Sequence, residues 1–352
     1  MVSPDPTAPP SASPTSAPAL AASKRGATGA LLLFALLLTA LFYYKWGGAL
    51  RTLAAVDSSG KLAVAPGAIL EGGVLATTLA YLRKIWPALV YGILIGAAVR
   101  AAIPAAWVRR WLGARSERAT LLGALAGAPL MLCSCCVTPV FTGVYQRGAR
   151  LSSALALMLA APGLNLAALA LTFALLPARV ALLRVAAALA IVLGLSSLIG
   201  RTLGDGARAP TPAACEIEDS PAWGELLARF IRNVGAMVLS TVPLIVVGVL
   251  LSAWVLPHFS ALRGSGTVVA VVVVALIGTL AALPTFFEIP LGLLLLSMGA
   301  PVPVVVAFVV AGPAVNLPSL LVLGRETGAR VTLALAGGVW MVATAAGLAA
   351  MV

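Results

Sequence analysis

Long apolar segments separated by short basic groups are the feature that most constrains the fold of this chain. Hydrophobic residues make up 61% of its 352 residues and charged residues 10%, and the mean hydropathy is +1.07. A soluble domain is about half apolar and about a quarter charged. So few charges cannot cover a water-exposed surface of this size, so the composition predicts an all-α integral membrane protein. Disordered, coiled-coil, collagen-like and disulfide-rich secreted architectures are excluded as the main fold.

The charge balance agrees with a membrane topology. The chain carries 23 Lys and Arg against 11 Asp and Glu, for a net charge of +12. In a soluble protein this excess would suggest a nucleic-acid partner. Here the basic residues stand between apolar runs, where they orient membrane segments, as in the arginine-rich stretch 100–118. We therefore expect membrane lipids as partners and no nucleic acid.

About nine hydrophobic segments are long enough to act as membrane segments. Residues 1–28 are expected to be a disordered tail rich in Pro, Ser, Thr and Ala. The run that follows, to about Tyr44, is interpreted as an uncleaved first helix, with a cleaved signal sequence as the alternative. A short amphipathic helix is expected at 68–84. The later segments are placed at 86–104, 119–146, 152–176, 179–200, 234–256, 266–298, 302–323 and 329–351.

An internal duplication relates the later segments. When Pro139 is set on Pro290 without gaps, the following matches appear: Gly148-Ala149 with Gly299-Ala300, Pro162 with Pro313, and Asn165 with Asn316. Duplicated halves are common in secondary transporters. We therefore predict two four-segment repeats and the following division of the chain: 1–28 tail, 29–84 first helix and amphipathic linker, 85–200 repeat 1, 201–229 polar loop, and 230–352 repeat 2.

The relative orientation of the two repeats depends on two segments, 119–146 and 266–298. Both are too long for one crossing and are interrupted by proline. If they cross fully, the repeats are parallel; if they are broken or re-entrant hairpins, the repeats are inverted. The inverted arrangement places more Lys and Arg on the inner side, so we prefer it.

A cysteine cluster is the first candidate site. Cys133, Ser134, Cys135 and Cys136 shortly precede Pro139, and proline leaves a backbone carbonyl unpaired within a helix. Irregular backbone at membrane depth persists only inside protein or beside a water-filled cavity. Thiolates bind soft ions such as Zn, Cu(I) and trivalent arsenic, so these residues are predicted to bind a transported soft ion. The alternative is that the cysteines are small buried apolar residues.

The repeat partner of this cluster contains Glu288, just before Pro290. It is the only acidic residue within the expected spans, and an ionisable group at membrane depth is a functional candidate. We expect it to carry a proton or contact a cation; a structural hydrogen bond at a helix break is the alternative. The paired motifs at Pro162 and Asn165, and at Pro313 and Asn316, are expected to shape helix breaks or line the path.

Other motifs exclude several classes of function. The sequence holds no Walker loop, Rossmann glycine pattern, nucleophile elbow or HExxH motif. A single histidine, His258, cannot build a typical zinc site, and Cys215 stands alone in the polar loop. We therefore expect neither an enzyme nor an ATP-driven pump, and no cofactor.

The combined motifs resemble a predicted-permease family that includes bacterial organoarsenical exporters. The residues that carry the resemblance are the Cys133-Ser134-Cys135 segment with Pro139, Arg147-Gly148-Ala149, Pro162 with Asn165, Glu288-Ile289-Pro290, and Ala311 to Ser319. It covers about residues 80–350. The resemblance implies a multi-pass permease of the bacterial plasma membrane. It also implies that Cys133, Cys135 and Cys136 bind the substrate, although Cys136 extends the usual family motif.

These observations predict a membrane permease that exports a soft thiophilic solute, such as a trivalent organoarsenical or a metalloid, with protons as the counter-ion. One alternative is a permease for an unrelated small solute, in which the cysteines only pack. The alternative from another class is a membrane thiol oxidoreductase that uses Cys133 and Cys136 as a redox pair.

Overall fold

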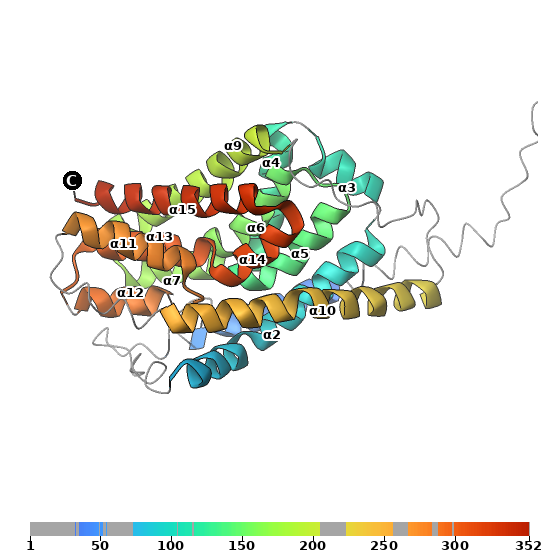
Figure 1. Cartoon of the computed structure of the whole chain (residues 1–352), viewed down its shortest axis with the longest axis horizontal. Coiled ribbons are helices and arrows are strands. Elements are labelled where there is room, and N and C mark those ends of the chain that lie inside the picture. Colours follow the sequence, from blue (N-terminus) through green and yellow to red (C-terminus); the bar gives the residue numbers. More distant parts are fainter. Residues whose placement is uncertain are drawn as a thin grey trace, which may run out of the picture.

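The computed structural model describes most of residues 32–54, and then 73–103, 105–114, 116–204, 223–255, 267–283, 288–297 and 299–351. Within these ranges all regular elements are helices, packed side by side as an elongated bundle (Figure 1). Residues 35–48 are helical. The later elements are α2 (Gly73–Ala102), α3 (Ala105–Leu112), α4 (Glu117–Gly127), η2 (Ala128–Leu130), α5 (Ser134–Gln146), α6 (Leu151–Gly163), α7 (Leu166–Leu175), α8 (Ala178–Leu189), η3 (Ala190–Leu195), α9 (Ser196–Thr202), α10 (Trp223–Val255), α11 (Thr267–Leu280), α12 (Glu288–Ser297), α13 (Val302–Ala314), α14 (Leu317–Thr327) and α15 (Ala329–Ala349).

Four described helical segments are long and apolar enough to cross a membrane. They are Leu151–Leu175, Ala178–Thr202, Leu227–Val247 and Ala329–Ala349. The number rises to six if two bent helix pairs each count as one span. The expectation of an all-helical membrane protein is thus confirmed, and the number of described candidate spans is lower than the nine expected segments.

The expected boundary between linker and first repeat falls inside one helix. The sequence predicted an amphipathic helix at 68–84 followed by a span at 86–104, but α2 is continuous from Gly73 to Ala102 and contains Pro87. The expected separation into two helices was wrong, since one helix runs through both stretches; a proline within a membrane helix is tolerated where neighbouring groups satisfy the freed backbone. Similarly, α10 already begins at Trp223, inside the expected loop 201–229. The tail 1–28, Cys215 and His258 lie outside the described residues.

The first long segment, 119–146, is broken as expected. It forms α4, the short η2, and α5, with an irregular stretch at 131–133 where Met131 adopts a left-handed conformation (φ 50°). A Cβ added to Gly123 would lie 2.2 Å from the Ser153 carbonyl oxygen, and one on Gly127 would lie 2.2 Å from that of Leu157. Helix α4 therefore runs alongside α6 in the same direction, in backbone contact.

The second long segment, 266–298, is also broken. It contains α11 and α12, and residues 281–283 between them have no regular structure. A Cβ added to Gly278 would lie 2.8 Å from the Ala311 Cβ, so α11 packs closely on α13. This arrangement corresponds to the packing of α4 on α6 in the first half.

Matching tight turns join α5 to α6 and α12 to α13. Gly148 and Gly299 both have positive φ, 94° and 82°. In each turn the glycine N–H bonds the carbonyl three residues back, and the N–H of the following alanine bonds the carbonyl five residues back. This pattern is a Schellman motif, in which glycine takes the left-handed conformation at lowest cost. Both turns reverse the chain, so α5 and α6, and likewise α12 and α13, pack as short helical hairpins.

Two further spans are interrupted near their middles. Helix α6 ends at Gly163 and α7 starts at Leu166, while α13 ends at Ala314 and α14 starts at Leu317. Asn165 and Asn316 are the N-cap residues of the helices that follow, so these breaks occur at equivalent positions of the expected duplication. The bend between α13 and α14 is 45°.

Candidate functional site

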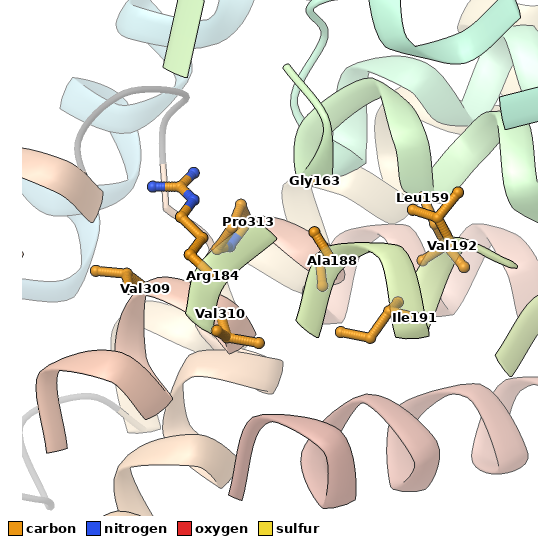
Figure 2. A pocket seen from close by; sticks show the side chains of 10 residues that line it. Leu159, Gly163, Arg184, Ala188, Ile191, Val192, Val309, Val310 and Pro313 are labelled. Carbon is orange, nitrogen blue, oxygen red and sulfur yellow. The ribbon is translucent and has the colours of Figure 1, made fainter. Parts of the chain in front are cut away.

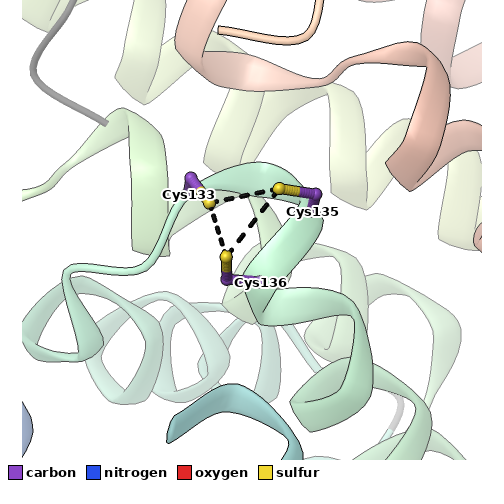
Figure 3. Close-up of side chains that lie close together, drawn as sticks. All are labelled: Cys133, Cys135 and Cys136. Atoms are coloured by element: carbon purple, nitrogen blue, oxygen red, sulfur yellow. Dashed lines mark hydrogen bonds between the residues drawn. The ribbon is translucent and has the colours of Figure 1, made fainter. Parts of the chain in front are cut away.

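The three cysteines converge where α5 begins. Cys133 is the N-cap residue of α5, and Cys135 and Cys136 lie in its first turn. The Cys133 sulfur lies 2.8 Å from that of Cys136 and 3.2 Å from that of Cys135, and the Cys135 and Cys136 sulfurs are 3.8 Å apart. All three side chains are free thiols, are buried, and face one another (Figure 3). We call residues 133–136 the thiol tip.

The thiol tip has the ligand set of a soft-ion site. Its three sulfur atoms lie within 4.8 Å of one another, and in the described part of the chain no other group of three His, Cys, Asp or Glu residues is close enough to hold a metal ion. Three sulfurs so placed can bind one soft metal or metalloid atom together. Hard cations such as Mg²⁺ prefer oxygen ligands instead. Ser134, between them, is buried as well.

Pro139 does not break the helix, contrary to the expectation of a free carbonyl at this point. It lies inside α5, and the irregular backbone instead precedes Cys133. The Thr138 hydroxyl donates a hydrogen bond of 2.6 Å to the Cys135 carbonyl oxygen, which is the group that Pro139 leaves without its helical N–H. This local bond lets α5 continue past the proline and holds the Cys135 backbone in place.

Helix α2 covers the thiol tip through glycine. A Cβ added to Gly92 would lie 2.0 Å from the Cys136 carbonyl oxygen, and one on Gly96 would lie 2.4 Å from that of Pro139. Such contacts are possible only without a side chain, so the two glycines allow α2 to seal one side of the tip. The tip is therefore enclosed by backbone.

Glu288 is the first residue of α12, and at the spacing that sets Pro139 on Pro290 it matches Val137, one residue after the thiol tip. It is 2% exposed, and its Oε1 accepts a hydrogen bond of 3.0 Å from Arg184 Nη2 in a buried ion pair. Arg184 Nη1 also donates to the Thr172 hydroxyl at 2.9 Å. We call Glu288 and Arg184 the carboxylate tip; it links α12 of the second half to α8 of the first.

Arg184 is the functional candidate that the sequence reasoning missed. It lies in the expected span 179–200, is 1% exposed, and shares α8 with one other charged residue, Arg179, at the start of the helix. An arginine well inside a predicted span is the same kind of signal that marked Glu288, because each charge at membrane depth requires a partner. The two signals together mark both residues as candidates, but only the structure shows that they pair.

A small, largely apolar pocket lies beside Arg184. Figure 2 shows Arg184 reaching past Pro313, away from Ile191 and Val192. The pocket is bounded by the ends of α6 and α13 as well as by α8 and η3, through the following residues: Leu159, Gly163, Arg184, Ala188, Ile191, Val192, Val309, Val310, Pro313 and Ala314. Residues from both halves of the chain thus line this pocket.

The hairpin geometry brings each tip near a helix break. Helices α5 and α6 have 13 residues each and reverse at Gly148, so the start of α5 lies at the same end of its hairpin as the end of α6. The thiol tip therefore approaches the break at Asn165. In the second half the Glu288 Cβ lies 3.9 Å from a Cβ added to Gly312, close to the break at Asn316. Pro162, Pro290 and Pro313 lie within helix ends at these breaks.

Comparison with known proteins identifies the family. The ArsP_1 family, described as "predicted permease", matches residues 71–352. This chain belongs to that family. The permease is also 30% identical over 307 residues to UPF0718 protein YraQ of Escherichia coli K12, covering 85% of this chain and 88% of that protein. It is 26% identical over 91 residues to UPF0718 protein MJ0584 of Methanocaldococcus jannaschii, covering 26% of this chain and 25% of that protein. No solved structure matches the permease.

Family membership and the apolar helices together indicate a multi-pass membrane permease, a transporter that acts on small molecules, rather than an enzyme. The resemblance seen in the sequence is thus confirmed at the level of the family.

Proposed function

We propose that this permease exports a soft, thiophilic solute, such as a trivalent organoarsenical or a metalloid, from bacteria across the plasma membrane. The observation that carries the proposal is the thiol tip, where three buried sulfur atoms lie within 4.8 Å of one another. A structural role for one cysteine needs no such clustering, since a single buried thiol packs as a small apolar group. Three sulfurs at an irregular start of a helix are instead suited to bind one soft centre.

The proposal includes two inverted repeats. Three observations support it: the matched turns at Gly148 and Gly299, the matched caps at Asn165 and Asn316, and helix bounds that recur at the spacing that separates Pro139 from Pro290. Helices α2 and α10, each with one internal proline, Pro87 or Pro243, run in opposite directions along one edge of the bundle (Figure 1). An inverted pair would place the two tips near the middle of the membrane, where secondary transporters bind substrate. Reporter fusions after Arg147 and within 201–229 should then both report the cytoplasm, and a periplasmic signal at either would favour parallel repeats.

The thiol tip is tested by replacing its sulfurs. Changing Cys133, Cys135 and Cys136 together to serine should abolish resistance to trivalent organoarsenicals while membrane levels of the protein stay unchanged. The matched control is Cys215→Ser, which removes a thiol elsewhere in the chain and should leave resistance intact. Full resistance in the triple variant would contradict the proposal.

We further propose that Glu288 couples transport to protons. The buried ion pair with Arg184 supports this role, because protonation of Glu288 would remove the charge that holds the two halves together at this point. Glu288→Gln keeps the shape but cannot exchange a proton, so it should bind solute yet lose transport driven by a pH gradient in vesicles. Wild-type transport with unchanged pH dependence would make Glu288 a structural residue.

A redox function is the second candidate, favoured by the 2.8 Å between the Cys133 and Cys136 sulfurs. This function requires a reversible disulfide and a redox partner. Mass spectrometry of membranes treated with oxidant and then reductant separates the two: a Cys133–Cys136 disulfide that cycles with the growth conditions supports redox chemistry, whereas thiols that stay reduced during export support transport. Export of an unrelated solute is favoured if the triple serine variant transports normally.

A further inference from the structure

In the described part of the chain, three side chains near the two helix breaks have buried N–H donors without a hydrogen-bond partner. They are Asn165 Nδ2, Asn316 Nδ2 and Arg184 Nε. Both asparagines are 0% exposed and the arginine is 1% exposed. A buried donor without an acceptor costs about 1–3 kcal/mol, so proteins rarely retain several of them without a reason.

The capping role of the two asparagines does not account for these donors. Asn165 Oδ1 accepts from the Ala168 N–H at 3.1 Å, and Asn316 Oδ1 accepts from the Ser319 N–H at 3.0 Å. Serine or aspartate caps a helix about as well as asparagine, through an oxygen. What asparagine adds is the NH₂ group at the other end of the carboxamide, and this group is the one left unpaired in both halves.

The three donors belong to one region of the bundle. Asn165 and Asn316 each come two residues after a residue that lines the pocket beside Arg184, namely Gly163 and Ala314, and Arg184 itself lines it (Figure 2). Because α5 and α6 form a tight hairpin, the Asn165 break also lies at the end of that hairpin that carries the thiol tip. One of the unpaired donors, that of Asn165, thus lies at the hairpin end that carries the soft ligands.

We propose that Asn165, Asn316 and Arg184 form an entry subsite that hydrogen-bonds the oxygen atoms of a hydroxylated solute before the thiols bind its soft centre. The inference rests on the function proposed above. The carboxamides are neutral and Glu288 already balances the charge of Arg184, so the subsite suits an uncharged hydroxide such as methylarsonous acid. Two thiols then replace its two hydroxyl groups: two As–S bonds form, two As–O bonds break, and each thiol proton leaves with a hydroxyl as water, without a change of oxidation state.

The test is the rate at which purified permease in detergent reacts with methylarsonous acid, followed by stopped-flow tryptophan fluorescence. Asn165→Ser and Asn316→Ser keep a capping oxygen and remove the NH₂ group, so each should slow the reaction about fivefold to tenfold, the equivalent of one hydrogen bond. Final occupancy, measured by arsenic content after dialysis, should not change. Silver ion, which binds thiols without presenting an oxygen, should react with wild type and variants at equal rates.

Thr142→Val is the matched control, because Thr142 Oγ1 is another buried unpartnered group on α5 but lies away from the thiol tip. Its reaction rate should equal that of wild type. Thermal unfolding checks that the variants fold. If a serine variant is unstable, Asn165→Asp or Asn316→Asp replaces it, because aspartate also keeps a capping oxygen and lacks the NH₂ group. Three results would overturn the subsite alone. The asparagine variants could react with silver ion as slowly as with methylarsonous acid, Thr142→Val could slow the reaction as much as they do, or neither asparagine variant could slow it. A wild-type protein that reacts with neither probe would overturn the thiol-binding function with it.

Discussion

The thiol tip and the carboxylate tip have similar structural settings but use opposite chemistry. Each starts the first helix of a short hairpin, α5 or α12, and each hairpin reverses at a glycine in the same type of turn. The thiol tip gathers three sulfurs within one half and is closed by backbone contacts from α2. The carboxylate tip instead joins the two halves through a buried ion pair. Two hairpins of similar geometry thus differ in what they carry: one has three soft ligands, and the other has a buried carboxylate paired with an arginine.

The largest expected effect comes from breaking the ion pair of the carboxylate tip. Arg184→Leu or Glu288→Leu alone leaves a buried charge without its partner, which should lower the free energy of unfolding by about 3–5 kcal/mol. The double variant Arg184→Leu with Glu288→Leu removes both charges and should regain most of the stability but not transport. Thermal unfolding and vesicle transport measure the two effects separately. If the double variant transports, the carboxylate tip is only structural.

A smaller effect is expected where α2 closes the thiol tip. Gly92→Ala puts a methyl group against the Cys136 carbonyl oxygen and should destabilise the protein by about 1–3 kcal/mol through overpacking. Gly235→Ala on α10 is the matched control, since a Cβ there meets nothing within 4 Å. It should be neutral or slightly stabilising, because alanine is favoured over glycine within a helix. Equal effects on unfolding temperature would mean that α2 does not enclose the tip tightly.

The smallest effect concerns the hydrogen bond of Thr138, which lets α5 continue past Pro139. Thr138→Val removes the hydroxyl that donates to the Cys135 carbonyl and should cost about 1 kcal/mol of stability, while Thr138→Ser keeps the donor and should cost less. The second half has Ile289 before Pro290 and so has no such donor. Unfolding temperatures of both variants measure the difference, and an equal loss for Ser and Val would assign it to lost packing of the methyl group.

Much of the fold follows from the sequence because apolar segment length and proline position are local signals. They predicted the breaks in 119–146 and 266–298, and the asparagines that cap α7 and α14 stand at positions singled out as paired. Local signals were insufficient at 68–104, where the mixed composition up to Lys84 suggested a separate amphipathic helix, but α2 runs through this stretch and through Pro87. Whether a proline ends a helix depends on packing partners that the sequence does not show.

The candidate site was predicted only in part for the same reason. The clustering of Cys133, Cys135 and Cys136 is visible in the sequence because these residues are neighbours. The pairing of Glu288 with Arg184 is not, since 104 residues separate them and only the packing of α8 near α12 brings them together. The role of Thr138 likewise depends on which carbonyl Pro139 leaves unpaired and on the side-chain conformation that reaches it.

The central claim is that the thiol tip binds the soft centre of the transported solute. Arsenic X-ray absorption of the purified permease loaded with arsenite tests this most directly, because it counts the sulfur and oxygen atoms bonded to arsenic. We predict that sulfur replaces oxygen around arsenic in the wild-type protein, and that the variant with serine at 133, 135 and 136 retains oxygen only. An oxygen-only arsenic environment in the wild-type protein, or a sulfur environment that persists in the triple variant, would contradict the claim.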